Sequence, residues 1–418
     1  MGFSRYLSII VLFSVAIHGC ASYNPDPSSE SLFLVRVETE IENNVRVKAA
    51  VPSAEETKQI FGVDLYRHGV QPVWIEIENK SEEQIWFLPV GLDPMYFTPF
   101  EAAFVSHFQS SSTANEKMNL YFFERGQDTY IPAGSVREGY VFTNLDEGTK
   151  IFNVDLEGED GQVAAFTFYI SVPGIKVDHH KVDFNSLYPA DADTWQNFED
   201  EEGLIEYLQK LPCCTANKKG VETGDPLNLI VIGSGDDVYH AFIRAGWDET
   251  ETITRGSASK AAASYLFGKL YRYSPVSALY VFGRRQDIAL QKARGTIHKR
   301  NHLRLWLAPV KFRGKLVWVG QISRDIGVKF SAKTIVTHKI DPDVDETRRY
   351  LIQDLLYSQG LSKFANVKGV GAAPIESPRQ NLAGDPYFTD GMRAVLWVSS
   401  KPVAFEKVEF IEWELPPE

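Results

Sequence analysis

Cysteine is nearly absent from this chain of 418 residues, which contains only Cys20, Cys213 and Cys214. Two of the three are neighbours, and one tandem pair cannot staple distant parts of a chain, so we expect no disulfide framework. The redox state of that pair stays open. Long apolar runs are also missing after the first twenty residues, and a membrane-spanning helix needs about 20 of them. We therefore expect a soluble body.

Signatures of common enzymes are missing as well. The sequence contains no G-x-S-x-G, no H-E-x-x-H and no conventional phosphatase motif. A "GSG" at 233–235 follows a buried strand and precedes a helix, but Val238 stands where the dinucleotide fingerprint needs a third glycine. We therefore expect no nucleotide cofactor, and indeed no cofactor at all. The missing nucleophile motif favours a binding or adaptor protein over an enzyme.

The N-terminus carries the clearest signal. An apolar run at 7–17 precedes "IHGC", which ends at Cys20 and resembles the lipobox of bacterial lipoproteins. This resemblance implies a signal peptide over 1–19 and a diacylated Cys20 that anchors the chain in a bacterial membrane. The polar residues of 20–31 then form a tether. Ala21, where an aspartate would retain the protein at the inner membrane, favours the periplasmic face of a Gram-negative outer membrane. An ordinary cleaved signal and an uncleaved anchor are the alternatives.

The rest of the chain divides by its hydrophobic pattern. Short alternating runs such as "QPVWIEIEN" and "AAFTFYISV", separated by turn residues, predict an all-β sandwich of immunoglobulin-like type over 32–175. The stretch 92–108 breaks the strand rhythm, and we expect a helical insertion there. A linker that ends in a helix follows over 176–224. Residues 225–418 mix strands with helices, which predicts an α+β domain with a mixed or antiparallel sheet.

Five stretches of this last domain are similar to a known family. They are "PLNLIVIGS", "SPVSALYVFGRRQDIALQKAR", "HLRLWLAP", "LVWVGQISRD" and "THKIDPDVDETRRYL". Together they resemble the LssY C-terminal-like domain over about 225–395. The family implies no established activity, but its fusion to membrane phosphatase domains of the phosphatidic-acid type points to an anionic lipid. The first domain resembles no family that we can name.

Acidic residues are scarce between positions 265 and 340, where sixteen lysines and arginines face only Asp287 and Asp325. The whole chain has a net charge of −12, so the charge is strongly segregated. Either this basic block docks on an acidic part of the same chain, such as 197–206, or it binds an anionic lipid or glycan. Nucleic acid is not an expected partner. The candidate anion-binding residues are Arg284, Arg285, Lys292 and Arg304.

Histidines next to this block are candidate acid–base groups. In "HLRLW", strand alternation places His302, Arg304 and Trp306 on one face, which is either an exposed sheet surface or the floor of a pocket. His302 or His338 could work with Asp341 in a hydrolase or transferase that acts on a phosphorylated lipid or glycan. His338 is flanked by apolar neighbours on its face and could equally be a satisfied core residue.

The stretch "THKIDPDVDETRRYL" admits three interpretations. A calcium loop of EF-hand type starting at Asp341 fails, because Glu346 stands where that loop needs glycine. A transition metal could use His338, Asp341 and Asp343. The third interpretation is a helix start with Asp345 as the N-cap. It explains Asp345 but leaves the other three side chains without a structural role.

Overall fold

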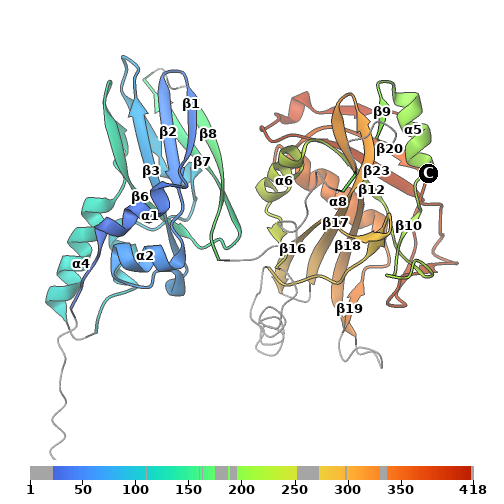
Figure 1. Ribbon diagram of the computed structural model, residues 1–418, viewed down its shortest axis with the longest axis horizontal. Coiled ribbons are helices and arrows are strands. Elements are labelled where there is room, and N and C mark those ends of the chain that lie inside the picture. The colour runs from blue at the N-terminus through green and yellow to red at the C-terminus, as the bar shows by residue number, and fades with distance from the viewer. Residues whose placement is uncertain are drawn as a thin grey trace, which may run out of the picture. The chain divides into compact units, whose positions relative to one another are not determined.

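The computed structural model describes residues 22–109, 111–159, 161, 163–174, 187–188, 195–251, 273–296, 299–329 and 337–415. Residues 1–21, which include Cys20 and the expected signal peptide, lie outside these residues, as do His179 and His180. The chain forms two compact units, the first containing residues up to Leu145 and Phe152–Phe168, the second containing Asp146–Ile151 and Tyr169–Glu418. Both are mainly β-structure, with several sheets and few helices (Figure 1). Among the described residues, no helix combines the length and apolarity needed to cross a membrane.

The first unit is built on two four-stranded sheets, ordered β1-β2-β3-β6 and β5-β4-β7-β8. Every strand pair of the first sheet is antiparallel. The strands are β1 (Glu38–Glu42), β2 (Val45–Ala50), β3 (Val70–Asn79), β4 (Ile85–Leu88), β5 (Tyr130–Ile131), β6 (Val136–Asn144), β7 (Thr149–Gly158) and β8 (Val163–Ser171).

Helices also belong to this unit, and of these the sequence predicts the one within 92–108. They are α1 (Ser31–Leu34), α2 (Ala54–Phe61), α3 (Pro99–Phe104) and α4 (Ser112–Arg125). Helix α2 begins with a capping box in which the side chains of Ser53 and Glu56 satisfy each other's backbone N–H groups. Gly62, with φ of 67°, ends it. These signals are legible in "SAEETKQIFG". Aromatic rings of α2 and α4 fill the core against β6.

Residues 22–31, part of the segment expected to be a tether, have fixed contacts with the first unit. The Tyr23 ring packs edge-on against Tyr121 of α4, with 6.1 Å between ring centroids. The backbone N–H of Asp26 donates to the carbonyl of Gln59 at 2.9 Å, and a 3-10 turn, η1 (Pro27–Glu30), follows. The polar composition of the segment is thus compatible with a fixed position, because its polar groups find partners in the first unit.

The second unit is built on a ten-stranded mixed sheet. The main path runs β13-β16-β17-β18-β12-β23-β20-β24, with β19 paired to β18 and β9 paired to β17. β12 runs parallel to β23 and antiparallel to β18. The strands are β9 (Gln196–Phe198), β12 (Leu229–Ile232), β13 (Asp248–Glu249), β16 (Ile288–Thr296), β17 (Lys299–Phe312), β18 (Lys315–Lys329), β19 (Thr337–Ile340), β20 (Leu361–Lys368), β23 (Met392–Val398) and β24 (Glu409–Ile411).

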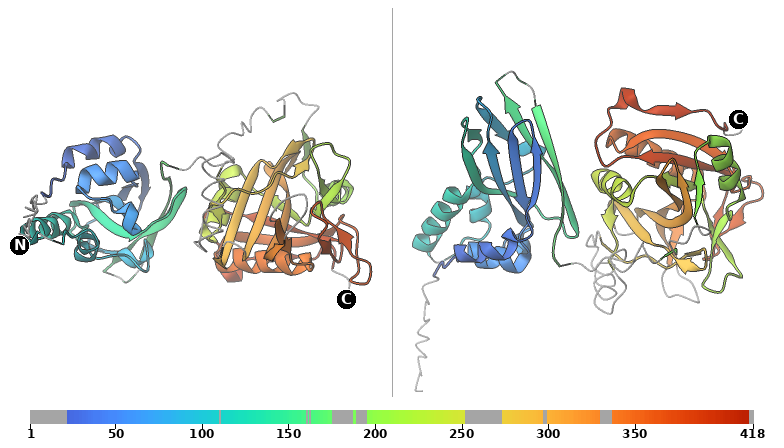
Figure 2. Two further views of the ribbon diagram at one scale, coloured as in Figure 1. Left: turned by 90° about the horizontal axis from the view of Figure 1, so that it is seen from below. Right: turned by 45° about the horizontal axis from the view of Figure 1, so that its top comes forward.

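Both faces of this sheet are covered (Figure 2). Helices α6 (Gly235–Arg244) and α8 (Val344–Tyr357) pack on the face that contains Leu229 and Val231. Helix α5 (Glu201–Lys210) packs on the other face, which contains Ile230 and Ile232. A strand buried on both sides needs apolar residues at successive positions, which is why "LIVI" lacks alternation.

A smaller sheet, β11-β10-β14-β15, belongs to the same unit. Its strands are β10 (Cys214–Ala216), β11 (Thr223–Pro226), β14 (Tyr280–Val281) and β15 (Arg284–Arg285). Cys213 and Cys214 are joined to each other in a vicinal disulfide at the start of β10. A two-stranded pair, β21 (Arg379–Gln380) and β22 (Pro386–Tyr387), completes the unit.

Candidate functional site

Polar side chains occupy one end of the large sheet, on the face that α5 covers. Along β17, Leu303, Leu305 and Leu307 point to the α6 and α8 face. The alternate residues His302, Arg304 and Trp306 point the other way, as strand periodicity requires, and Trp306 joins the core there. His302 is 7% exposed and Arg304 is 6% exposed. Of the two possibilities left open by the sequence, an exposed surface is therefore excluded.

His302 is bonded to a carboxylate on the neighbouring strand. β17 and β18 are antiparallel, with His302 opposite Ser323. Asp325 lies two residues further along β18, on the same face, and its Oδ2 is 2.6 Å from His302 Nε2. Burial lowers the pKa of His302, and Asp325 only partly opposes this effect. The ring is therefore neutral at pH 7, and a neutral ring beside a carboxylate carries its proton on Nε2.

Two arginines lie on the same polar face. Arg304 Nη1 donates to Gln321 Oε1 at 2.9 Å, and Arg300 Nη1 donates to Gln291 Oε1 at 2.7 Å. Burial lowers the pKa of both guanidinium groups. For Arg304 the nearby carboxylate of Asp225 acts in the opposite direction.

Asp225 supplies the second carboxylate of this face. Burial raises its pKa, whereas the amide of Asn381, which donates to it at 3.0 Å, and the charge of Arg304 lower it. We call His302, Asp325, Arg300, Arg304 and Asp225 the polar layer. Its two cations and two carboxylates balance, which is how buried charges are tolerated.

The polar layer is suited to proton transfer. A neutral imidazole held by a carboxylate is the usual arrangement of a general base. The amide nitrogen of Gln321 is buried and has no hydrogen-bond partner among the described residues. A buried donor of this kind is the exception in folded proteins and is expected to meet a water or a ligand. The sequence paired His302 with Asp341, whereas in the structure the carboxylate bonded to the His302 ring is that of Asp325.

The four candidate anion-binding residues do not converge. Lys292 donates to Asp354 at 2.6 Å, which lies on α8 and therefore on the opposite face of the sheet from Arg304. Arg284 forms a double hydrogen bond with Asp287, at 2.9 and 2.8 Å. Arg285 is exposed on β15. A single anion site made of all four is therefore excluded, because a sheet separates Lys292 from Arg304.

The acidic stretch before α8 has a structural role that differs from the predicted one. Asp343 is the N-cap, and its Oδ1 accepts from the backbone N–H of Asp345 at 3.1 Å and of Glu346 at 3.0 Å. The prediction that Asp345 caps this helix is wrong. Asp345 is buried in the first turn, where it accepts from Thr389 Oγ1 at 2.8 Å and pairs with Arg348.

The metal candidates of this stretch are accounted for in part. Asp341 Oδ1 accepts from the backbone N–H of Asp343 at 3.1 Å, so both carboxylates serve the helix start. His338 lies on β19, and its side chain is outside the described part of the chain. Within the described residues, no three His, Cys, Asp or Glu side chains are grouped so that they could hold a metal ion.

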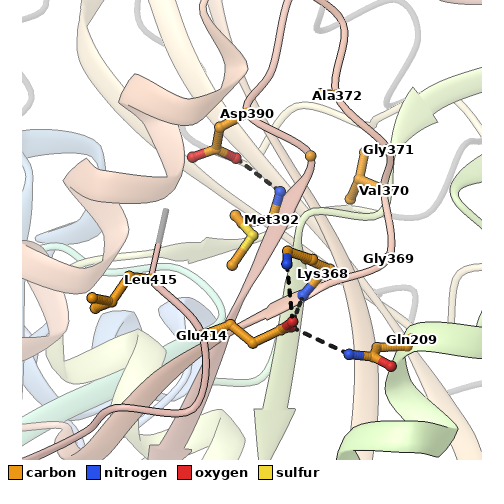
Figure 3. A pocket seen from close by; sticks show the side chains of 11 residues that line it. Gln209, Lys368, Gly369, Val370, Gly371, Ala372, Asp390, Met392, Glu414 and Leu415 are labelled. Atoms are coloured by element: carbon orange, nitrogen blue, oxygen red, sulfur yellow. Dashed lines mark hydrogen bonds and ion pairs between the residues drawn. The ribbon is translucent and has the colours of Figure 1, made fainter. Parts of the chain in front are cut away.

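A surface pocket of 840 Å³ lies elsewhere on the second unit (Figure 3). Its walls are the glycine-containing segments 368–372 and 390–392, with Gln209, Glu414 and Leu415. Figure 3 shows that Glu414 accepts from Gln209 and from Lys368, so the one lysine of the lining is already paired. The glycines of "KGVG" and "DG" are the signal by which the sequence could have indicated this pocket. Its paired charges give no preference for an anion.

A buried arginine contacts Gly369 in the wall of this pocket. Arg393 is fully buried and donates to the carbonyls of Leu211, Pro212 and Gly369. Burial lowers its pKa to about 10. A Cβ at Gly369 would lie 2.7 Å from Arg393 Nε, so only glycine leaves room for this guanidinium.

Comparison with known proteins agrees with the motifs of the second unit. The family model described as the LssY C-terminus matches residues 205–392, slightly less than half of the chain. No curated protein matches. The match includes the second half of α5 and the vicinal cysteines, which the motifs alone had not included, and all five residues of the polar layer. The second unit of this chain therefore contains a domain that matches the LssY C-terminus family.

Proposed function

We propose that this protein is a cell-envelope lipoprotein whose second unit binds an anionic, phosphate-bearing envelope ligand. Cys20 carries the lipid, and the protein lies at the periplasmic face of the outer membrane of a Gram-negative bacterium. The first unit, which we interpret as an immunoglobulin-like sandwich with added helices, acts as an adaptor. The "IHGC" sequence at the end of an apolar run supports the lipid anchor.

The distribution of charge over the large sheet carries the proposal of anion binding. In the sheet interior, Lys292 has a carboxylate partner from the same unit, Asp354. At the end where β17 begins and β18 ends, the strand register places three lysines by their backbone: Lys299 opens β17, Lys329 closes β18, and Lys339 lies on β19 opposite Gly327. The only acid between residues 288 and 340 is Asp325, which is bonded to His302. This end of the sheet therefore has an excess of positive charge, which attracts anions.

Vesicle binding by the intact chain tests this proposal. We expect binding to vesicles that contain an anionic phospholipid and weakening as salt is raised. The double variant Lys329→Glu/Lys339→Glu is expected to bind roughly tenfold or more weakly, at about 1 kcal/mol per lysine near the surface. The matched control, Lys218→Glu/Lys219→Glu, reverses the same charge in the exposed turn between β10 and β11. Equal binding by the two variants would contradict the proposal.

A hydrolase or transferase acting on a phosphorylated lipid or glycan is the second candidate function. The bond between His302 and Asp325 inside a polar layer favours it. The test is release of inorganic phosphate from phosphatidic acid by the wild type and by His302→Gln. Activity that His302→Gln abolishes would favour the enzyme, whereas equal release by both proteins would remove His302 from any catalytic role.

Lipidation has its own test. Cys20→Ala should accumulate as an unprocessed precursor that takes up no labelled fatty acid. A variant that is labelled and sorted like the wild type would refute the lipoprotein interpretation.

A further inference from the structure

Helices α3 and α4 of the first unit expose large apolar side chains. Phe100 is 52% exposed and Phe104 is 70% exposed on α3, while Leu120 is 57% exposed and Phe123 is 59% exposed on α4. The rings of Phe100 and Phe123 lie 5.6 Å apart, so the two helices form one continuous surface. We call these four residues the aromatic patch. Single exposed apolar residues are ordinary, but a contiguous group marks a contact site.

The patch is not the core face of either helix. Helix α4 buries Ala114, Met118 and Phe122, which follow each other at four-residue intervals and meet the core of the first unit. Leu120 and Phe123 lie outside that stripe. A helix that is apolar on a second side has a second apolar neighbour.

An open apolar groove adjoins the patch. It has a volume of 500 Å³, and its lining includes Phe97, Phe100 and Phe104. The groove and the exposed rings together form one apolar surface.

The start of the described chain is fixed to the same helix. Tyr23 packs against Tyr121 of α4, and Arg125, the last residue of α4, forms an ion pair with Glu30. Only two residues lie between Cys20 and Tyr23, so three Cα–Cα steps connect them. A fully extended chain spans at most about 3.6 Å per residue, so the lipid attachment point lies within about 11 Å of Tyr23. The anchor thus holds α4 close to the bilayer.

We propose that the aromatic patch inserts into the interface of the bilayer that holds the lipid anchor. The inference rests on the proposed lipidation of Cys20. Glu101, Glu116 and Glu124 surround the patch and are exposed, with Lys117 as a basic neighbour. This excess of acid opposes attraction to anionic lipid, so the contact depends on burial of apolar surface. The first unit lies on the membrane through this patch instead of moving freely about a tether.

A fluorescent label on the acylated full-length chain tests the proposal. The chain is placed in phosphatidylcholine liposomes with an environment-sensitive fluorophore at Phe123→Cys. The matched control carries the label at Ile41→Cys, which is 70% exposed on β1 of the same unit. We expect a blue-shifted emission, quenched by a lipid-borne quencher, at position 123 but not at position 41. Adding anionic lipid should leave the signal unchanged.

A variant that lacks two aromatic rings of the patch provides the second test. In the chain labelled at position 123, the double substitution Phe100→Ser/Phe104→Ser should reduce the ratio of inserted to free label roughly tenfold or more. The reason is that the apolar contact of both rings with the bilayer is lost. Both side chains are exposed, so the first unit should keep its unfolding temperature. An unchanged ratio would overturn the proposal.

The outcomes separate this proposal from the proposed function. Intact mass is measured first, and a chain without acyl groups refutes the lipoprotein interpretation together with this inference. An acylated chain whose label at position 123 stays in water overturns the patch alone, and a partner protein as the true occupant would give the same result. A signal that requires anionic lipid also overturns it.

Discussion

Asp325 should contribute more to the stability of the second unit than His302, the residue to which it is bonded. His302 is neutral, so His302→Gln changes no charge and loses at most one hydrogen bond to a charged acceptor, which is worth about 1.5–3 kcal/mol. Asp325 also compensates the charges of Arg300 and Arg304, as its effect on the pKa of each shows. Asp325→Asn keeps the shape but removes that charge from a buried layer. Loss of one partner of buried charges costs about 3–5 kcal/mol.

Urea unfolding of the intact chain, followed by tryptophan fluorescence, measures both costs. Six of the eight tryptophans belong to the second unit, and Trp306 lies beside Arg304 on β17, so the signal reports mainly on this unit. We expect Asp325→Asn to lower the unfolding free energy by about 2 kcal/mol more than His302→Gln. Equal losses, or a larger loss for His302→Gln, would refute the view that Asp325 balances the arginines.

Three further predictions concern pH, the start of α8 and the glycine pocket. Burial lowers the pKa of His302 in the folded chain, so the unfolded chain takes up a proton at this residue first as the pH falls through about 6.5. The unfolding free energy of the second unit should then fall by at most about 1.4 kcal/mol per pH unit, until the pH reaches the lowered pKa. Urea titrations at several pH values should show this loss in the wild type and not in His302→Gln. Asp343→Ala should lower the unfolding free energy by about 1 kcal/mol, because the helix loses its N-cap. Asp345→Ala should lower it more, because the buried carboxylate of Asp345 has several partners. Thermal melts in which Asp345→Ala is the more stable of the two variants would contradict this. Gly369→Ala should destabilise by about 2 kcal/mol or more, since φ is +149° and the methyl group would meet Arg393; an unchanged melting temperature would contradict this.

Local patterns were sufficient for the parts of the second unit that depend on neighbouring residues. The apolar run before "GSG" predicts a buried strand and the residues after it a helix, and both are present as β12 and α6. Alternation in "HLRLW" correctly assigns His302 and Arg304 to one face, because the side-chain period of a strand is fixed by its backbone. The family resemblance also followed from local motifs.

Local patterns were insufficient where several residues could fill one role. Asp341, Asp343 and Asp345 are all acceptable N-caps by composition, and only the position at which the backbone leaves the extended conformation selects Asp343. In the first unit, strand-like runs on either side of α2 and α4 led to an all-β prediction. The capping box of α2 is a local signal for that helix, and the prediction did not use it.

The sequence by itself determined the strand alternation, the charge segregation and the similarity of the second unit to the LssY C-terminus family. Only the tertiary structure decided which charges meet. His302 and Asp325 are distant in sequence and become partners because β17 and β18 pair in one particular register. Lys292 and Arg304, close in sequence, are separated because their side chains leave opposite faces of the same sheet. Strand pairing is a long-range choice, made by the burial of both faces at once, and no local pattern contains it.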